Sequence, residues 1–501
     1  MNMSIHENGK KGEFYLSKSL FVRGVRCHKS LYLQKYRPEL KDEVSEETEN
    51  KFEAGFEIGD LAQNLFPGGV IVPYDGLSHA EQIEMTATLI AQDCKTIYEA
   101  TFFFNGVFVK ADILHHGDNG WDVYEVKNST EVKPYHLDDV SVQYYVITDS
   151  GLSLSRVFLV HINNQYVRQG EIEVDKLFHK EDITTIAKEK QAFVVEEIEK
   201  QRAMLKGEEP IIDIGSHCNE PYECDFIGHC WSHIPSPSVF DYRGAGQPNC
   251  FTLYKQGIVR MEDVPSDSLG WRQKLQLDGV LHQKNHIDVD AVRNFLQSLW
   301  YPLCFMDFET TFMVSIPIFD GTRPYQQVTF QFSADVINNP GCELEHHEFL
   351  ADGNTNPQKE FLERLLAIVP SNACVLVWNK GFEISRLKEL ADTFPEKSSE
   401  INHLISNVRD LMKPFQDKSI YYWQFNGSFS IKAVLPALVP ELSYDNLDIS
   451  DGAAASSSWL RIIQSKNEEE KSSIRKQLLQ YCHLDTLAMV RILEIMKNMA
   501  E

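Results

Sequence analysis

An acid, a second acid and a lysine occur in the first third of the chain at a spacing that suits metal-dependent chemistry. The stretch VKADILHHGDNGWDVYEVK, residues 109–127, reads as two strands joined by the turn GDNG. If the DN pair forms a two-residue loop, Asp112 lies opposite Glu125; if the NG pair forms it, Asp112 lies opposite Lys127. Side chains alternate along a strand, so either register puts all three residues on one face of the sheet.

Two carboxylates directly opposed across strands, about 5 Å apart, should repel each other. A divalent cation shared between Asp112 and Glu125 would remove that repulsion. This arrangement suits the cleavage of phosphodiester bonds, with Mg²⁺ or Mn²⁺ held by the acids and Lys127 orienting the attacking water. The alternative is an exposed hairpin with incidental charges.

A second group of acids lies in the last 200 residues. The apolar stretch LCFMDFETTF carries Asp307 and Glu309 on one face of an expected strand, where unpaired acids would be costly. Glu383 stands at a strand-to-helix junction, and Tyr481 and Asp485 are four residues apart on one face of an expected helix. Four carboxylates at such positions could bind two Mg²⁺ ions on either side of a scissile phosphate.

Three cysteines recur at six-residue intervals in HCNEPYECDFIGHCW, namely Cys218, Cys224 and Cys230, and Cys27 lies far upstream. Three clustered thiolates need a fourth ligand to complete a tetrahedral zinc site or a [4Fe–4S] cluster. The remaining cysteines lack such spacing and are expected to be packing residues: Cys94, Cys250, Cys304, Cys342, Cys374 and Cys482.

The periodicity of the chain indicates which elements position these residues. Residues 15–66 and 183–206 have helical patterns, and residues 97–165 read as strands. From residue 302, strands alternate with helices, and a long helix is expected over roughly 470–499. This pattern predicts an α/β protein. The expected divisions are an N-terminal domain over 1–240, a helical connector over 241–298 and a C-terminal domain over 299–501.

The composition limits where the protein acts and what it binds. With 501 residues the chain is long enough for two or three domains. No apolar run approaches the length of a transmembrane helix, and the first 20 residues lack the apolar stretch of a secretory signal, so we expect a cytoplasmic protein with no membrane partner. A net charge of −25 argues against coating nucleic acid by bulk attraction but allows an enzyme with a local basic groove.

The N-terminal motif D-x(12)-E-V-K resembles the PD-(D/E)XK core of RecB-like nucleases, although alanine replaces the proline. The resemblance implies a restriction-endonuclease-like fold in which Asp112 and Glu125 bind the metal and Lys127 is catalytic. Glu99 matches the acid often found one strand earlier. Gln143 matches the downstream glutamine motif, but it is followed directly by two tyrosines and not by one four residues on.

The cysteine pattern is similar to the iron–sulfur clasp of the AddB type and of RecB-like nucleases of CRISPR adaptation, including the sequence RCHKSLYL around Cys27. The resemblance implies a [4Fe–4S] cluster that staples the ends of the nuclease fold together, with zinc as the alternative.

The C-terminal acids resemble the DEDDy branch of RNase H-like 3′–5′ exonucleases, with glutamate at position 383 where the family usually has aspartate. In that likeness Tyr481 positions the attacking water, and Asp410 and Lys432 are candidate substrate contacts. The implied metal ligands are Asp307, Glu309, Glu383 and Asp485.

Over nearly its full length the chain resembles bacterial fusions of a RecB-like nuclease with a YprB-like RNase H-fold domain, a family of unknown function. Three hypotheses follow: two active nuclease sites, one active site beside a domain that binds nucleic acid, or a non-catalytic scaffold in repair or defence. The expected substrate is a single-stranded end of DNA or RNA. Protein partners stay open.

Overall fold

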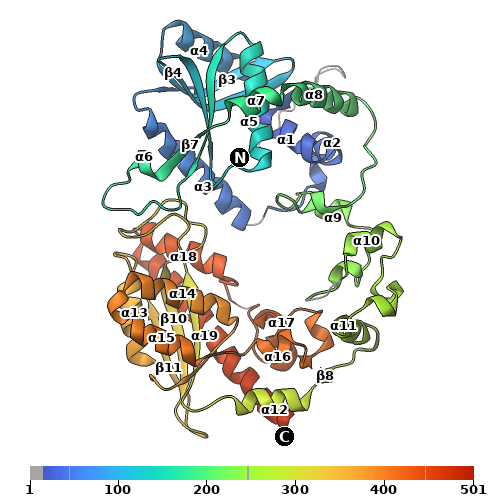
Figure 1. The fold of residues 1–501 in the computed structure, drawn as a ribbon, viewed down its shortest axis with the longest axis vertical. Helices are drawn as coiled ribbons and strands as arrows, with labels where there is room; N and C mark the ends of the chain where they lie inside the picture. Colours follow the sequence, from blue (N-terminus) through green and yellow to red (C-terminus); the bar gives the residue numbers. More distant parts are fainter. Residues whose placement is uncertain (1–14, 45, 245–247, 446) are drawn as a thin grey trace. The chain divides into compact units, whose positions relative to one another are not determined.

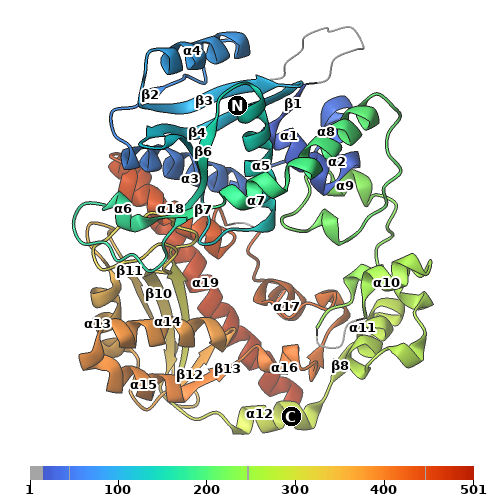
Figure 2. The same cartoon turned by 45° about the horizontal axis from the view of Figure 1, so that its top comes forward.

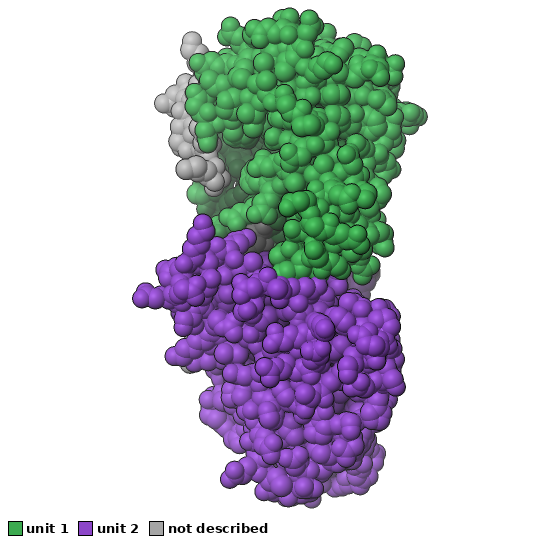
Figure 3. Space-filling view, turned by 90° about the vertical axis from the view of Figure 1, so that its left-hand side faces the viewer, with its two compact units in different colours: residues 1–233, 315–325 green, residues 234–314, 326–501 purple. Residues whose placement is uncertain are grey.

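Two large β-sheets organise the chain in a computed structural model, which describes residues 15–501 apart from 45, 245–247 and 446. The described residues form two compact units (Figure 3), and each sheet belongs to its own unit. Unit 1 comprises the described residues up to 233 together with 315–325, and unit 2 comprises residues 234–314 and 326–501. The predicted α/β class is confirmed.

The sheet of unit 1 has seven strands in the order β2-β3-β4-β5-β6-β7, with β1 paired to the start of β4. Neighbours β3, β4 and β5 run antiparallel, whereas β5 and β6 are parallel and are connected through helix α5. The strands are β1 (Leu16–Ser17), β2 (Val70–Ile71), β3 (Thr96–Phe104), β4 (Val107–Gly117), β5 (Gly120–Lys127), β6 (Leu154–Ile162) and β7 (Phe178–Asp182).

The β4–β5 hairpin settles the register that the sequence left open. Gly117 pairs with Gly120, so the DN pair forms the two-residue loop, and Ile113 pairs with Tyr124. Continuing this register places Asp112 opposite Glu125.

Helix α5 packs against β3 and β4 and against helices α1, α7 and α8 (Figures 1 and 2). Val142 and Val146 of α5 are fully buried in this core. The helices of unit 1 are α1 (Lys18–Arg26), α2 (His28–Tyr36), α3 (Glu46–Ala62), α4 (His79–Ala91), α5 (Pro134–Asp149), α6 (Val174–Leu177), α7 (Thr184–Glu189), α8 (Gln191–Leu205) and α9 (Ile227–Cys230).

Residues 315–325 lie between two strands of the unit 2 sheet but belong to unit 1. Arg168 donates hydrogen bonds to the carbonyl oxygens of Pro317 and Ile318, at 2.9 and 2.7 Å. Asn128, one residue beyond β5, accepts a hydrogen bond from Ser315 at 2.5 Å. Nothing in the sequence pattern indicated that this segment packs with the N-terminal unit.

The sheet of unit 2 has five strands in the order β11-β10-β9-β12-β13. Strand β10 runs antiparallel to β9 and β11, whereas β9, β12 and β13 are parallel. The strands are β9 (Leu303–Thr310), β10 (Thr329–Ile337), β11 (Glu345–Leu350), β12 (Cys374–Val377) and β13 (Val408–Asp410), and a separate pair is formed by β8 (His286–Ile287) and β14 (Ile420–Tyr421).

The two faces of this sheet are covered by different helices. Met306 and Phe308 of β9 pack into a core with residues of α13, α14 and α15. On the opposite face, Gln331 of β10 donates to the carbonyl oxygen of Leu478 in α19, and Ser333 hydrogen-bonds Thr486. Alternation along β9 therefore turns Asp307 and Glu309 toward α19.

Helix α19 runs over Glu468–Ala500 and confirms the predicted long terminal helix. The other helices of unit 2 are α10 (Cys250–Lys255), α11 (Trp271–His282), α12 (Val289–Gln297), α13 (Gln358–Ile368), α14 (Lys380–Thr393), α15 (Ser398–Asn407), α16 (Lys413–Gln416), α17 (Ile431–Leu438) and α18 (Gly452–Gln464). Across the described residues, every helix is too short or too polar to cross a membrane.

Candidate active sites

Glu125 is the centre of the polar cluster in unit 1. It is 1 % exposed, and its two carboxylate oxygens accept three hydrogen bonds. Oε1 accepts from Lys18 Nζ of α1 at 2.6 Å and from Lys127 Nζ at 2.7 Å. Oε2 accepts from Gln143 Nε2 of α5 at 2.5 Å, and Gln143 also donates to the Lys110 carbonyl oxygen.

Asp112 lies beside Glu125 but has a different partner. Its Oδ2 accepts a hydrogen bond from the Val126 backbone nitrogen at 2.7 Å, which ties the two strands together. Glu99 faces the same cluster from β3. The ladder pairs on either side of Glu99 are regular, but Glu99 itself has a φ of +56°, a conformation that few non-glycine residues adopt. The predicted acids of unit 1 thus converge.

The cluster also contains two residues that the sequence analysis did not identify. Asp139 of α5 forms an ion pair with Lys127, and Lys18 Nζ lies 3.9 Å from Asp139. Asp139 precedes Gln143 by four residues, so helical periodicity alone places both on one face. No local pattern marked Lys18, because it is more than 100 residues away from Glu125 in the sequence.

Burial and charge act in opposite directions on these carboxyl groups. Burial alone would raise the pKa of Glu125, but Lys127 and Lys18 outweigh it and hold that pKa far below its usual range. Burial raises the pKa of Asp112, and the Glu125 charge raises it further. Burial is also the main reason that the pKa of Glu99 is raised. The cluster therefore has one firmly ionised acid held by two lysines.

In unit 2, four acids from three elements form one cluster, in which Glu309, Glu383 and Asp485 are close enough for their charges to raise the pKa of Asp307. Asp307 and Glu309 come from β9, Glu383 from the first turn of α14, and Asp485 from α19. Glu383 is 1 % exposed, and its Oε2 has no hydrogen-bond partner. Cys482, assigned to packing from the sequence, places its thiol 3.8 Å from Asp307 Oδ2.

Burial raises the pKa of all four acids, and neighbouring acids raise it further for Asp307 and Glu309. Burial is the largest cause for Asp307 and Glu309, and the Asp485 charge is the next, so both have pKa values well above their usual range. Burial raises the pKa of Glu383 to about 8 and that of Asp485 to about 6. The cluster is thus short of positive charge, although Lys432 lowers the pKa of Glu309 and Asp485 somewhat.

Two tyrosines hold Asp485. Tyr444 donates a hydrogen bond to Asp485 Oδ1 at 2.6 Å, and Tyr481 also lies within hydrogen-bonding reach of this carboxylate. Burial and the neighbouring acids raise the pKa of both phenols, so both stay protonated and act as donors. Tyr444 was missed because it lies in an irregular segment 41 residues before Asp485.

Asp410 is hydrogen-bonded to the backbone at the start of α14. Its carboxylate accepts from the backbone nitrogens of Asn379, Lys380 and Met412 at 3.1 to 3.4 Å. These bonds anchor the start of α14, the helix that carries Glu383. Asp410 therefore positions a candidate ligand, and its own contact with substrate stays a prediction.

The four predicted cysteine ligands also lie together, lining one small hollow in unit 1. Cys27 joins α1 to α2, and the other three lie in and before α9. Burial raises the pKa of Cys27, and it raises that of Cys230 to about 11. Within the described residues, no three of these thiols come within 4.8 Å of one another.

Charged contacts hold the cysteine segment independently of any metal. Arg23 of α1 binds Asp225 through two nitrogens at 2.7 and 2.9 Å. Arg26 donates to the carbonyl oxygens of His217 and Cys218 at 2.9 Å. These contacts join residues nearly 200 positions apart, so the two ends of unit 1 meet at the cysteines.

Comparison with known proteins adds relatives without an established function. Residues 304–430 match DUF2779, a domain of unknown function. The chain is similar to the uncharacterized protein MG366 of Mycoplasma genitalium, at 27 % identity over 42 % of this chain and 34 % of the relative. It is also similar to the uncharacterized protein UU173 of Ureaplasma parvum serovar 3, at 24 % identity over 44 % of this chain and 35 % of the relative. Each match therefore spans about a third of the relative's length.

Proposed function

We propose that the chain is a metal-dependent nuclease in which unit 2 removes nucleotides from 3′ ends and unit 1 contains a second hydrolytic site. The convergence of four acids in unit 2 carries this proposal. Carboxylates buried so close together are costly unless they are protonated or share a cation. Glu383 supports this reading most directly, because one of its buried oxygens has no hydrogen-bond partner.

The donor set fits Mg²⁺ or Mn²⁺, which prefer oxygen ligands. Asp307, Glu309, Glu383 and Asp485 would hold the metal. Cys482 is not a suitable ligand, because burial and the adjacent acids raise its pKa far above its usual range and keep it a neutral thiol. When bound, the metal activates water and stabilises charge on the leaving oxygen.

The protein's own residues would orient the reaction. A protonated Tyr481 donates hydrogen bonds, so it can orient the attacking water but not remove its proton. Tyr444 fixes Asp485 from the other side. Lys432, whose charge lowers the pKa of Glu309 and Asp485, is the candidate contact for a substrate phosphate. The mixed sheet, with its first two acids on the central strand β9, agrees with the expected RNase H-like fold.

Substitution of one acid tests the proposal. Asp307→Asn should lower Mg²⁺- or Mn²⁺-dependent hydrolysis of a single-stranded oligonucleotide by at least about 10³-fold, since it removes charge stabilisation at the reacting centre. Asp392→Asn is the matched control, because Asp392 is an exposed acid on the same helix as Glu383. Equal activity of Asp307→Asn and wild type would exclude unit 2 as the nuclease.

In unit 1, Asp112 and Glu125 would hold a metal and Lys127 would orient water, as in the PD-(D/E)XK likeness, with Glu99 as a further acid beside them. The hydrogen bonds from Lys18 and Lys127 to Glu125 favour a second candidate, in which unit 2 alone is catalytic and unit 1 binds nucleic acid. Asp112→Ala distinguishes the two candidates. If the variant lacks some of the cleavage products that wild type makes, both sites are active. If its products are the same as those of wild type, unit 2 alone is active.

We also propose that the four cysteines bind a [4Fe–4S] cluster. Four thiolates on one zinc ion, at about 2.3 Å, would lie about 3.8 Å from one another. Because no three of these thiols lie within 4.8 Å of one another, a larger cluster of iron and sulfide suits them better. Protein purified without oxygen should be brown and contain iron. Stoichiometric zinc without iron would reverse the choice of cofactor.

A further inference from the structure

A second set of metal-type donors lies in unit 2, apart from the four acids. Asp335 of β10, His346 of β11 and His483 of α19 each offer a ligand atom, and these atoms all lie within 4.8 Å of one another. Asp335 and His346 are direct partners in the β10–β11 ladder. Asp335 Oδ1 lies 2.8 Å from His346 Nδ1, and the two imidazole rings are stacked with centroids 3.8 Å apart.

This group is separate from the candidate active site, although His483 lies between Tyr481 and Asp485 in the sequence. Two residues along an α-helix turn the side chain by roughly 200°. His483 therefore points to the β11 flank of α19, whereas Tyr481 and Asp485 point to the acids. Helix α19 therefore contributes to two separate clusters. One consists of carboxylates, and the other contains two imidazoles and one carboxylate.

Asp335 provides an independent reason to expect a ligand. The residue is 0 % exposed, and its Oδ2 has no hydrogen-bond partner among the described residues. Buried polar atoms are nearly always paired, because an unpaired carboxylate oxygen loses its hydration without compensation. A cation at this point would supply the missing partner.

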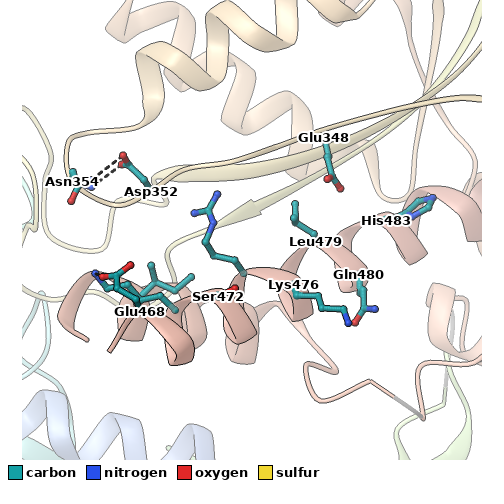
Figure 4. A pocket seen from close by; sticks show the side chains of 12 residues that line it. Glu348, Asp352, Asn354, Glu468, Ser472, Lys476, Leu479, Gln480 and His483 are labelled. Atoms are coloured by element: carbon teal, nitrogen blue, oxygen red, sulfur yellow. Dashed lines mark hydrogen bonds and ion pairs between the residues drawn. The ribbon is translucent and has the colours of Figure 1, made fainter. Parts of the chain in front are cut away.

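The site is open to solvent on one side. A hollow of about 640 Å³ ends at Glu348 of β11 and His483 of α19, which project toward it from the two elements (Figure 4). Glu348 Oε2 lies 3.3 Å from His346 Nε2. The hollow therefore offers an entry path, together with a fourth ligand in the form of Glu348 or water.

We infer that Asp335, His346 and His483 form a binding site for a zinc-class divalent cation. Two imidazoles and a carboxylate suit Zn²⁺ and its first-row neighbours, whereas Mg²⁺ prefers oxygen ligands alone. Ligands of one tetrahedral zinc ion lie roughly 3.3 Å apart, so the separations of these donors need to change by no more than about 1.5 Å. The bound ion would pin α19 to the edge of the sheet. The inference does not depend on the proposed nuclease activity.

Zinc binding by the full chain tests the inference. Chelator-treated protein is incubated with Zn²⁺ and desalted, and the metal per chain and the Tm are measured for wild type and for His346→Ala and His483→Ala. His347→Ala is the matched control, because His347 is the next residue of β11 and faces the other side of the sheet. We expect the two variants to retain one zinc fewer per chain than wild type and to lose the rise in Tm caused by Zn²⁺, while His347→Ala behaves as wild type.

Any zinc bound at the cysteines is present in wild type and in every variant, so it does not affect the difference in zinc content between them. Equal zinc content and equal rises in Tm in all four proteins would overturn the inference and leave a hydrogen-bonded, stacked trio without a metal. If circular dichroism shows that a histidine variant is unfolded, Asp335→Asn decides, since it keeps the size of the side chain. Loss of one zinc in Asp335→Asn supports the site, and full retention overturns it.

Discussion

The acid clusters of the two units accommodate buried negative charge in opposite ways. In unit 1, Glu125 is ionised because two lysines donate to it at 2.6 and 2.7 Å. In unit 2, burial raises the pKa of both Asp307 and Glu383, and the charges of Asp485 and Glu309 raise that of Asp307 further. The carboxylates of unit 1 have lysines that stabilise the ionised form, whereas those of unit 2 would need a bound cation to become fully ionised.

This difference predicts how each site responds to a divalent cation. In unit 2, the cation would replace protons and relieve repulsion between acids, so binding should be favourable and should release protons. In unit 1, the cation would have to displace a lysine ammonium from Glu125 first. The comparison therefore predicts tighter metal binding in unit 2.

The largest expected effect concerns the lysine of unit 1. In an Asp307→Asn background, which silences unit 2, Lys127→Ala should reduce the remaining cleavage by at least about 10²-fold, because it removes the group that orients water. The fold should persist, since Lys18 still pairs with Glu125. Cleavage rates and circular dichroism measure both effects. Lys206→Ala, an exposed lysine at the end of α8, is the control, and equal rates in the two variants would exclude a role for Lys127.

The second effect is a pH dependence of stability in unit 2. The pKa of Glu383 is about 8 in the folded chain and 4.5 when unperturbed. Between these values the unfolded chain releases a proton that the folded chain retains, so stability should fall as pH rises from about 5 to 8 and then level off. Between the unperturbed pKa of 4.5 and the folded-state pKa of about 8, the loss from this group is on the order of 5 kcal/mol, at about 1.4 kcal/mol per pKa unit.

Urea unfolding of metal-free protein at a series of pH values measures this dependence. Glu383→Gln should flatten the curve, because glutamine does not titrate, and Asp392→Asn should leave it unchanged. Added Mg²⁺ should flatten the wild-type curve in the same way. If the free energy of unfolding changes by the same amount between pH 5 and 8 in wild type and in Glu383→Gln, Glu383 does not have a raised pKa in the folded chain.

The smallest expected effect concerns the competition between Lys18 and a metal ion for Glu125. Lys18→Gln removes one of the two cations from Glu125, so the affinity of unit 1 for Mn²⁺ should increase about tenfold, or about 1.4 kcal/mol. Titration calorimetry in an Asp307→Asn, His346→Ala background measures this affinity with both candidate metal sites of unit 2 disabled. A weaker affinity in Lys18→Gln would show that Lys18 supports the metal site and does not compete with the metal.

Local patterns predicted those parts of the fold and sites that depend on neighbouring residues. Strand alternation placed Asp112 and Glu125 on one face, and only the hydrogen-bond ladder selected the register. Helical spacing placed Tyr481 and Asp485 together on the long terminal helix. Family resemblance, and not spacing, joined Cys27 to the distant trio, and the structure brings these four cysteines to one hollow.

The missed residues share a physical reason. Lys18, Tyr444 and Asp335 reach their clusters through long-range packing and occur in segments without a recognisable motif. The same holds for residues 315–325, which lie between two strands of one unit but pack with the other. Such contacts depend on tertiary structure, which periodicity does not encode.

Cleavage by protein that lacks the unit 1 site shows whether unit 2 is a 3′–5′ exonuclease. Asp112→Ala protein, with Mn²⁺, is given a linear single strand labelled at its 5′ end and a circular strand of the same sequence, as DNA and as RNA. We expect shortening of the linear strand from its 3′ end with release of mononucleotides, an intact circle, and no activity once Asp307→Asn is added. Cleavage of the circle, or activity that persists in the double variant, would contradict it.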